Sequence, residues 1–271
     1  PLRSNDSLFV FVEVTVDPTS QNSPLLIPDS IVFQTNGNVQ DVKLVAWGQD
    51  VHLFKSKTIT TDTILQADKP YLVYDSLVVN PNVSLTIEAG AKFHFHNFSL
   101  LKVYGTLKVN GEPDNPVVFE GDRLEKFYRD KAGQWTGIWL YAFSKNNSIR
   151  WAEIKNSIVG LIVDTCVTPG TPTLTMSHSK VENTSYIGLL ARGAKIDADN
   201  CLFANSAQIS VALTLGGAYR FYHCTVANYW GDYMFRNGPA LLLNNYYLYQ
   251  LVEDGSYYIE PRDLTEASFY N

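Results

Sequence analysis

The sequence predicts an all-β protein: a right-handed parallel β-helix, which is a solenoid of short strands, preceded by a small β-sandwich module, complete or truncated. Three observations predict this class. Similar segments recur along the second half of the chain, short stretches alternate apolar and polar residues, and helical periodicity is absent. At 271 residues the chain is long enough to bury a sizeable core.

The repeat is the most informative of these features. Four segments align with one another: WAEIKNS, HSKVENT, CLFANSA and CTVANYW. The alignment places an asparagine at the same position of each, at intervals of 27, 22 and 23 residues, and these are Asn156, Asn183, Asn205 and Asn228. The longer first interval contains the Pro/Gly-rich insertion VTPGTP. A repeat of roughly 20 to 25 residues is typical of a solenoid.

A parallel coil gives asparagine a physical reason to recur at one corner. Equivalent residues of successive turns stack about 4.8 Å apart. A stacked amide can donate to one neighbour and accept from the other, and asparagine tolerates the left-handed backbone of a tight corner. We therefore expect an asparagine ladder. Two further strand sets, one containing GLIVDT, GLLARG, SVALTL and YMFRNG and the other TLTMSH, KIDADN and YRFYHC, complete three strands per turn.

The chain before the repeats has a different pattern. Residues 8–16 and two later alternating segments are strand-like, and the later pair is joined at Asn36-Gly37, a strong hairpin signal. We expect a sandwich-like module over residues 1–57, with a connector beginning at 56, and the β-helix with its C-terminal cap over residues 58–271. The first residues carry no signal peptide, so we expect the printed sequence to begin inside a longer protein.

The composition and net charge of the chain limit the classes of binding partner. The net charge is −6 and no cluster of lysine and arginine is visible, which argues against a nucleic-acid partner. No stretch approaches the roughly 20 apolar residues that a membrane span needs. The cysteines Cys166, Cys201 and Cys224 show no zinc spacing and are expected to be small buried side chains. Cys201 and Cys224 share one column, so a disulfide between them is compatible with their distance.

Several motifs resemble a known family. The segments are LTIEAG at residues 85–90, GTL at 105–107, NPVVF at 115–119 and QWTGI at 134–138. Together, over roughly residues 70–250, they resemble the pectin-lyase-like right-handed β-helix proteins that are predicted in Bacteroidetes to be surface lipoproteins. The strands before them resemble the small sandwich that often precedes the helix in that family. The resemblance implies an exported protein, held by a lipid anchor at the cell surface or in the periplasm, and it supplies no catalytic residue.

Two groups of residues are candidates for ligand binding on the outer strand faces. Asp164, Arg192, Thr214 and Arg236 each follow a ladder asparagine by eight or nine residues, so they fall near one column that could bind an acidic sugar. The alternative is a salt-bridged surface ladder of little energetic weight. Asp197 and Asp199 share one strand face and could hold calcium, although no partner from a neighbouring turn is evident and a solvated polar face is the alternative.

Two other segments carry polar groups of interest. His94 and His96 share a strand face opposite two inward phenylalanines, but a third metal ligand is missing, so we expect an exposed face and no metal site. The charged segment at 121–135 interrupts the repeats, and its Arg123 and Arg129 could contact a polar ligand. A solvated loop is the alternative.

These observations favour a non-catalytic extracellular or cell-surface module that binds a polysaccharide or a surface protein along its rigid strand faces. An enzyme of the polysaccharide lyase or glycoside hydrolase type would need clustered carboxylates, which no pair of turns offers. A structural spacer is the third alternative. We expect no cofactor, with calcium as the one candidate ion, and the oligomeric state is left open.

Overall fold

The computed structural model describes residues 7, 9–13, 25–165, 171–229, 238–250 and 256–271. Within these residues the secondary structure is entirely β, with no helix, as the sequence predicts. The chain divides into two compact units, Pro1–Val51 and His52–Asn271. The division falls a few residues before the expected boundary at 57, because the strand that starts at His52 already belongs to the solenoid.

The described part of the first unit contains a small antiparallel sheet of two strands. β1 (Leu25–Thr35) pairs with β2 (Asn38–Gly48), and the turn between them uses positive φ angles at Asn36 (50°) and Gly37 (83°). The hairpin predicted at Asn-Gly is therefore present. The strand expected at 8–16 is not formed over residues 9–13, and the described residues of this unit show a hairpin in place of a sandwich.

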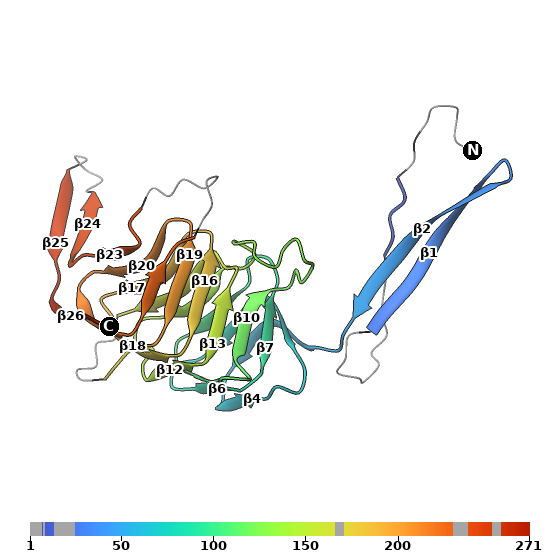
Figure 1. Cartoon of the computed structure of the whole chain (residues 1–271). Helices are drawn as coiled ribbons and strands as arrows, with labels where there is room; N and C mark the ends of the chain where they lie inside the picture. Colours follow the sequence, from blue (N-terminus) through green and yellow to red (C-terminus); the bar gives the residue numbers. More distant parts are fainter. Residues whose placement is uncertain (1–6, 8, 14–24, 166–170, 230–237, 251–255) are drawn as a thin grey trace. The chain divides into compact units, whose positions relative to one another are not determined.

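The second unit is a parallel β-solenoid of about seven turns. Its strands form three rows (Figure 1). The first row contains β7 (Lys92–Phe95), β10 (Val117–Gly121), β13 (Ala152–Lys155), β16 (Lys180–Thr184), β19 (Leu202–Ser206) and β22 (Thr225–Ala227). The second row contains β8 (Leu100–Val103), β11 (Gly137–Leu140), β14 (Val159–Asp164), β17 (Ile187–Arg192), β20 (Ile209–Thr214) and β23 (Leu241–Leu243).

The third row forms a separate sheet. It contains β4 (Thr63–Leu65), β6 (Ser84–Glu88), β9 (Thr106–Asn110), β12 (Asn147–Arg150), β15 (Leu174–Ser177), β18 (Lys195–Asp199), β21 (Gly217–Tyr222) and β26 (Leu264–Tyr270). Between β23 and β26 the chain forms an antiparallel hairpin of β24 (Tyr246–Gln250) and β25 (Tyr257–Pro261).

The first two rows are joined at the start of the solenoid by long strands. β3 (His52–Ile59) pairs along its length with β5 (Tyr71–Val79), and β5 continues from the first row into the second. Its beginning pairs with β7 and its end pairs with β8. The connector expected from residue 56 therefore contains strands of the first two turns.

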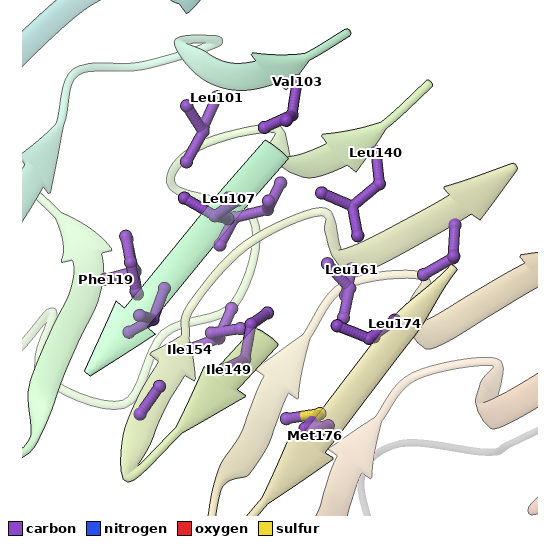
Figure 2. Packing of buried hydrophobic residues seen from close by; sticks show 14 of the residues in the cluster. Leu101, Val103, Leu107, Phe119, Leu140, Ile149, Ile154, Leu161, Leu174 and Met176 are labelled. Atoms are coloured by element: carbon purple, nitrogen blue, oxygen red, sulfur yellow. The ribbon is translucent and has the colours of Figure 1, made fainter. Parts of the chain in front are cut away.

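The core lies inside the coil, where alternate residues of all three rows point inward. Figure 2 shows these side chains, among them Leu101, Phe119, Ile154 and Leu174, which are fully buried. Aromatic rings stack from turn to turn: the centroids of Tyr71 and Phe93 are 4.7 Å apart, and those of Phe93 and Phe119 are 5.2 Å apart. The continuous interior therefore stabilises each turn through its neighbours.

The asparagine column marks the corner between the first and second rows. Asn156, Asn183 and Asn205 have positive φ angles of 64°, 55° and 53°. The Asn205 amide donates to the Asn183 oxygen at 3.3 Å. The other members bond elsewhere: Asn156 donates to the Arg129 carbonyl at 2.9 Å, and Asn228 accepts from the Ser206 backbone N–H at 2.8 Å. The column is thus a set of corner residues with one direct amide contact between neighbours.

The aromatic interior gives a stability prediction. Replacing Phe93 by alanine should lower the free energy of unfolding by about 3 to 5 kcal/mol, because the ring is fully buried between two others. Replacing Lys92, which is exposed on the same strand, should change it by less than about 0.5 kcal/mol. Urea unfolding of both variants measures this difference. Equal midpoints for Phe93→Ala and Lys92→Ala would contradict the inward assignment of Phe93.

Candidate functional site

The predicted column of polar residues lies on the outer face of the second row. The register pairs Asp164 of β14 with Arg192 of β17, and Arg192 with Thr214 of β20. Arg236 lies outside the described residues. On the side away from β17, β20 pairs with β23, which follows the segment YMFRNG in the chain.

Asp164 and Arg192 form a two-point ion pair. Arg192 Nε donates to Asp164 Oδ1 at 2.6 Å and Nη2 donates to Oδ2 at 2.9 Å. The indole N–H of Trp139 also donates to Oδ2 at 2.8 Å. The side chain of Asp164 is 14% exposed and that of Arg192 is 38% exposed, so the carboxylate is partly withdrawn from solvent and the guanidinium reaches outward. Thr214 donates to the Ala191 carbonyl and stands beside this pair.

Aromatic rings extend the same surface over the two preceding turns. The Trp139 and Tyr141 rings stack with their centroids 4.2 Å apart, and Tyr141 lies 4.4 Å from Tyr104. The Arg192 guanidinium lies 5.5 Å from the centre of the Trp139 ring. Burial, followed by the neighbouring Tyr104 hydroxyl, raises the pKa of Tyr141 above its ordinary value. We call this surface the aromatic platform and define it as Tyr104, Trp139, Tyr141, Asp164 and Arg192.

The aromatic platform combines packed aromatic rings with a charged pair, and both kinds of group can bind a ligand. Rings from two successive turns pack against one another, and a charged pair holds the Trp139 ring in place. Lys102 of β8 pairs with Trp139 in the register and adds a positive charge on this outer face. Aromatic rings give a large contact surface at low entropic cost, which suits a polar ligand with apolar faces.

Asp197 and Asp199 lie on the outer face of the third row. Both oxygens of Asp197 accept hydrogen bonds from Arg220, from Nε at 2.8 Å and from Nη2 at 2.7 Å. Asp199 lies 3.4 Å from His223 Nδ1. The partner of Asp197 is thus an arginine on the next turn, which the sequence alignment did not identify. Within the described ranges, no group of three or more His, Cys, Asp or Glu side chains is arranged to hold a metal ion.

The outer face of the first row carries two histidine–carboxylate pairs. His94 Nδ1 lies 3.5 Å from Glu120, and Lys155 contacts the other oxygen of Glu120 at 2.9 Å. His96 Nδ1 lies 2.6 Å from Asp122. An exposed face was expected for both histidines; His96 is exposed, but His94 is only 8% exposed. Burial lowers the pKa of His94, and the negative charge of Glu120 partly opposes that effect.

The charged segment after β10 folds onto itself and onto the adjacent corner. Arg123 lies over the Tyr128 ring at 3.6 Å. The Arg129 carbonyl accepts the hydrogen bond from Asn156, and the Gln134 side chain donates to the Tyr128 carbonyl at 2.6 Å. The Arg123 side chain therefore contacts a ring of its own loop. Arg129 contacts the asparagine corner through its backbone carbonyl.

Comparisons of the chain with protein-family models, curated proteins and solved structures find no match. No helix in the described part of the chain is long and apolar enough to cross a membrane.

The burial of His94 predicts a dependence of stability on pH. The unfolded chain binds a proton at His94 near the ordinary value of 6.5, whereas the folded chain binds it less readily. The stability that the neutral imidazole provides is therefore fully present above that value and falls as the pH drops through it. Unfolding midpoints measured between about pH 7 and pH 5 should decline less steeply in His94→Gln than in the unsubstituted chain.

His223→Gln serves as the control, because His223 is exposed and pairs with a carboxylate at the surface. We expect His223→Gln to keep the full decline of the unfolding midpoint with falling pH. If His94→Gln keeps the full decline as well, the buried imidazole is not the cause of the pH dependence.

Proposed function

We propose that the solenoid is a non-catalytic module that acts outside the cell and binds an acidic polysaccharide on the aromatic platform. The observation that carries this proposal is the row of rings Tyr104, Tyr141 and Trp139, which continues into the Asp164–Arg192 pair. A rigid sheet sets the distance between the rings, so the binding surface is organised before the ligand arrives. Binding to such a surface loses little conformational entropy.

The chemistry of the platform favours a sugar chain with negative charge. The packed rings together offer an apolar surface against which the apolar face of a sugar ring can rest. Lys102 beside Trp139 supplies positive charge, and Asp164 adds no net negative charge because its partner Arg192 neutralises it. A carboxylated or sulfated polysaccharide fits this combination better than a neutral one. A surface protein with an acidic, extended segment is the other partner class.

The location follows from the sequence motifs and remains part of the proposal. The segments LTIEAG, GTL, NPVVF and QWTGI resemble surface lipoproteins with a β-helix, which supports export and a lipid anchor at the cell surface or in the periplasm. A module at that place would meet polysaccharides directly.

Removing the central ring should abolish most of the binding. Titration of immobilised acidic polysaccharide with Trp139→Ala should show at least a tenfold weaker dissociation constant, about 1.4 kcal/mol, because the indole both stacks on Tyr141 and bonds to Asp164. The affinity of the unsubstituted chain should fall with added salt, since charge contributes to it. Calcium should leave the affinity unchanged.

Trp151→Ala is the matched control, because Trp151 lies at the corner before β13 and its ring faces His178 rather than the platform. Equal losses in both tryptophan variants would place the binding surface elsewhere. If a panel of acidic and neutral polysaccharides gives no saturable binding at all, the spacer alternative replaces this proposal.

A second candidate function, a polysaccharide lyase or hydrolase, is favoured by one observation. His94, Glu120 and Lys155 lie in one column on the first row, and burial favours the neutral, proton-accepting form of His94 by lowering its pKa. A neutral imidazole beside a carboxylate and a lysine is the kind of group that could remove a proton from a uronic acid.

The catalytic alternative predicts ultraviolet absorbance from unsaturated sugar products, or new reducing ends, when the chain is incubated with acidic polysaccharides. This signal should fall by at least about a hundredfold in His94→Gln, in keeping with the usual contribution of a general base. Lys180→Ala is the control, since Lys180 pairs with Glu153 on the same face. Saturable binding with neither signal excludes the enzyme and retains the binding module.

A further inference from the structure

Two cysteines occupy the same corner of consecutive turns. Cys201 precedes β19 and Cys224 precedes β22, and the residues that follow them, Leu202 and Thr225, are paired in the parallel register. The Thr225 backbone N–H donates to the Cys201 carbonyl at 2.8 Å. The residues before them, Asn200 and His223, have nearly identical positive φ angles of 49° and 50°. The backbone therefore places the two cysteines in the same conformation, one above the other.

The side chains repeat this stacking. Each thiol lies 3.3 Å from the carbonyl two residues before it, that of Asp199 for Cys201 and that of Tyr222 for Cys224. The ionisation of each thiol is influenced by the other. Cys201 is buried and Cys224 is partly accessible, and both thiols are free. The pair thus places a partly accessible thiol next to a buried one in the adjacent turn.

We propose that Cys201 and Cys224 form a thiol–disulfide site, which closes into a cross-link between the last two turns of the solenoid when a small disulfide oxidant is present. Equivalent residues of neighbouring parallel strands lie about 4.8 Å apart, within the 4.4 to 6.8 Å that disulfides span between Cα atoms. The bond therefore requires only rotation of the side chains and small local shifts. The reduced pair is the form that the structure describes.

The environment assigns a role to each sulfur. The neighbouring Cys201 side chain lowers the pKa of Cys224 to about 7, while burial opposes this effect. The neighbouring Cys224 side chain, together with burial, raises the pKa of Cys201 well above its ordinary value. Cys224 is therefore the thiolate that reacts first, and it is also the more accessible sulfur.

The reaction balances with one equivalent of a low-molecular-weight disulfide such as oxidised glutathione. The Cys224 thiolate attacks one oxidant sulfur, which forms a mixed disulfide and releases one thiolate. Cys201 then gives up its proton and attacks the Cys224 sulfur, which forms the intramolecular disulfide and releases the second thiolate. Two protein thiols are oxidised, the oxidant is reduced to two thiols, and both protons leave with them.

The test uses the full chain with Cys166→Ser, so that only the two stacked cysteines remain. After reduction and desalting, the folded protein is treated with oxidised glutathione, and free thiols, intact mass and melting temperature are measured. We expect both thiols to disappear, a mass loss of two hydrogens with no bound glutathione, and a rise in melting temperature of roughly 5 to 10 °C from closure of the loop. Reductant should reverse all three changes.

A second variant keeps the order of the steps testable. Cys201→Ser in the same background should retain one glutathione on Cys224, whereas Cys224→Ser should react far more slowly. The proposal is overturned if both thiols of the folded protein stay titratable while the urea-unfolded protein forms the bond. It is equally overturned if oxidation yields only a covalent dimer, or if the Cys201 sulfur proves the more reactive of the two.

Discussion

The constraint on which this structure depends is the in-register pairing of parallel strands from one turn to the next. Backbone hydrogen bonds hold equivalent residues of successive turns beside each other, so every position of the repeat becomes a column. Inward columns fill with apolar side chains that stack on their own kind, as Tyr71, Phe93 and Phe119 do. Outward columns bring together side chains that are distant in the chain, from 23 residues apart for Asp197 and Arg220 to 37 for Tyr104 and Tyr141. Core and surface chemistry follow from the same register.

The outward columns show how the same geometry leads to different chemistry on each face. On the first row, histidine, glutamate and lysine alternate along one column, and the charges pair with one another. On the second row, aromatic rings precede one arginine–aspartate pair. On the third, Asp197 and Arg220 pair in the same way. On all three faces, charged side chains form ion pairs with one another. The aromatic platform differs from the other two faces because it adds a group of packed rings to such a pair.

The sequence was sufficient for the solenoid where the repeat was regular. The asparagine alignment places Asp164, Arg192 and Thr214 in one column, and the pairing of β14, β17 and β20 has that register. It did not assign residues to columns before residue 150, because the charged segment at 121–135 interrupts the spacing and no ladder asparagine marks those turns. Tyr104, Trp139 and Tyr141 were therefore not connected with Asp164. The Arg220 partner of Asp197 was within reach, since shifting the second segment back by one residue, so that KIDADN aligns with AYRFYH, places the two residues side by side.

The alternation of apolar and polar residues does not predict how many strands pair or how far an outward side chain is buried. Alternation identified β1 and β2 as strands, but it does not state how many strands pair, so a sandwich was expected where the described residues form a hairpin. It placed His94 on an outward face, but the flanking long side chains of Glu120 and Lys155 determine how much water reaches it.

The segment between β10 and β11 leaves the coil and returns to it at the same corner. Gly121 and Gln134 lie so close that a side-chain carbon at Gly121 would meet the Gln134 oxygen at 2.4 Å. The strands on either side nevertheless keep their pairing with the turns above and below. The length of this excursion is therefore independent of the coil's spacing. A lineage could lengthen, shorten or exchange the segment, and so alter what is recognised beside the scaffold, while the scaffold itself folds unchanged.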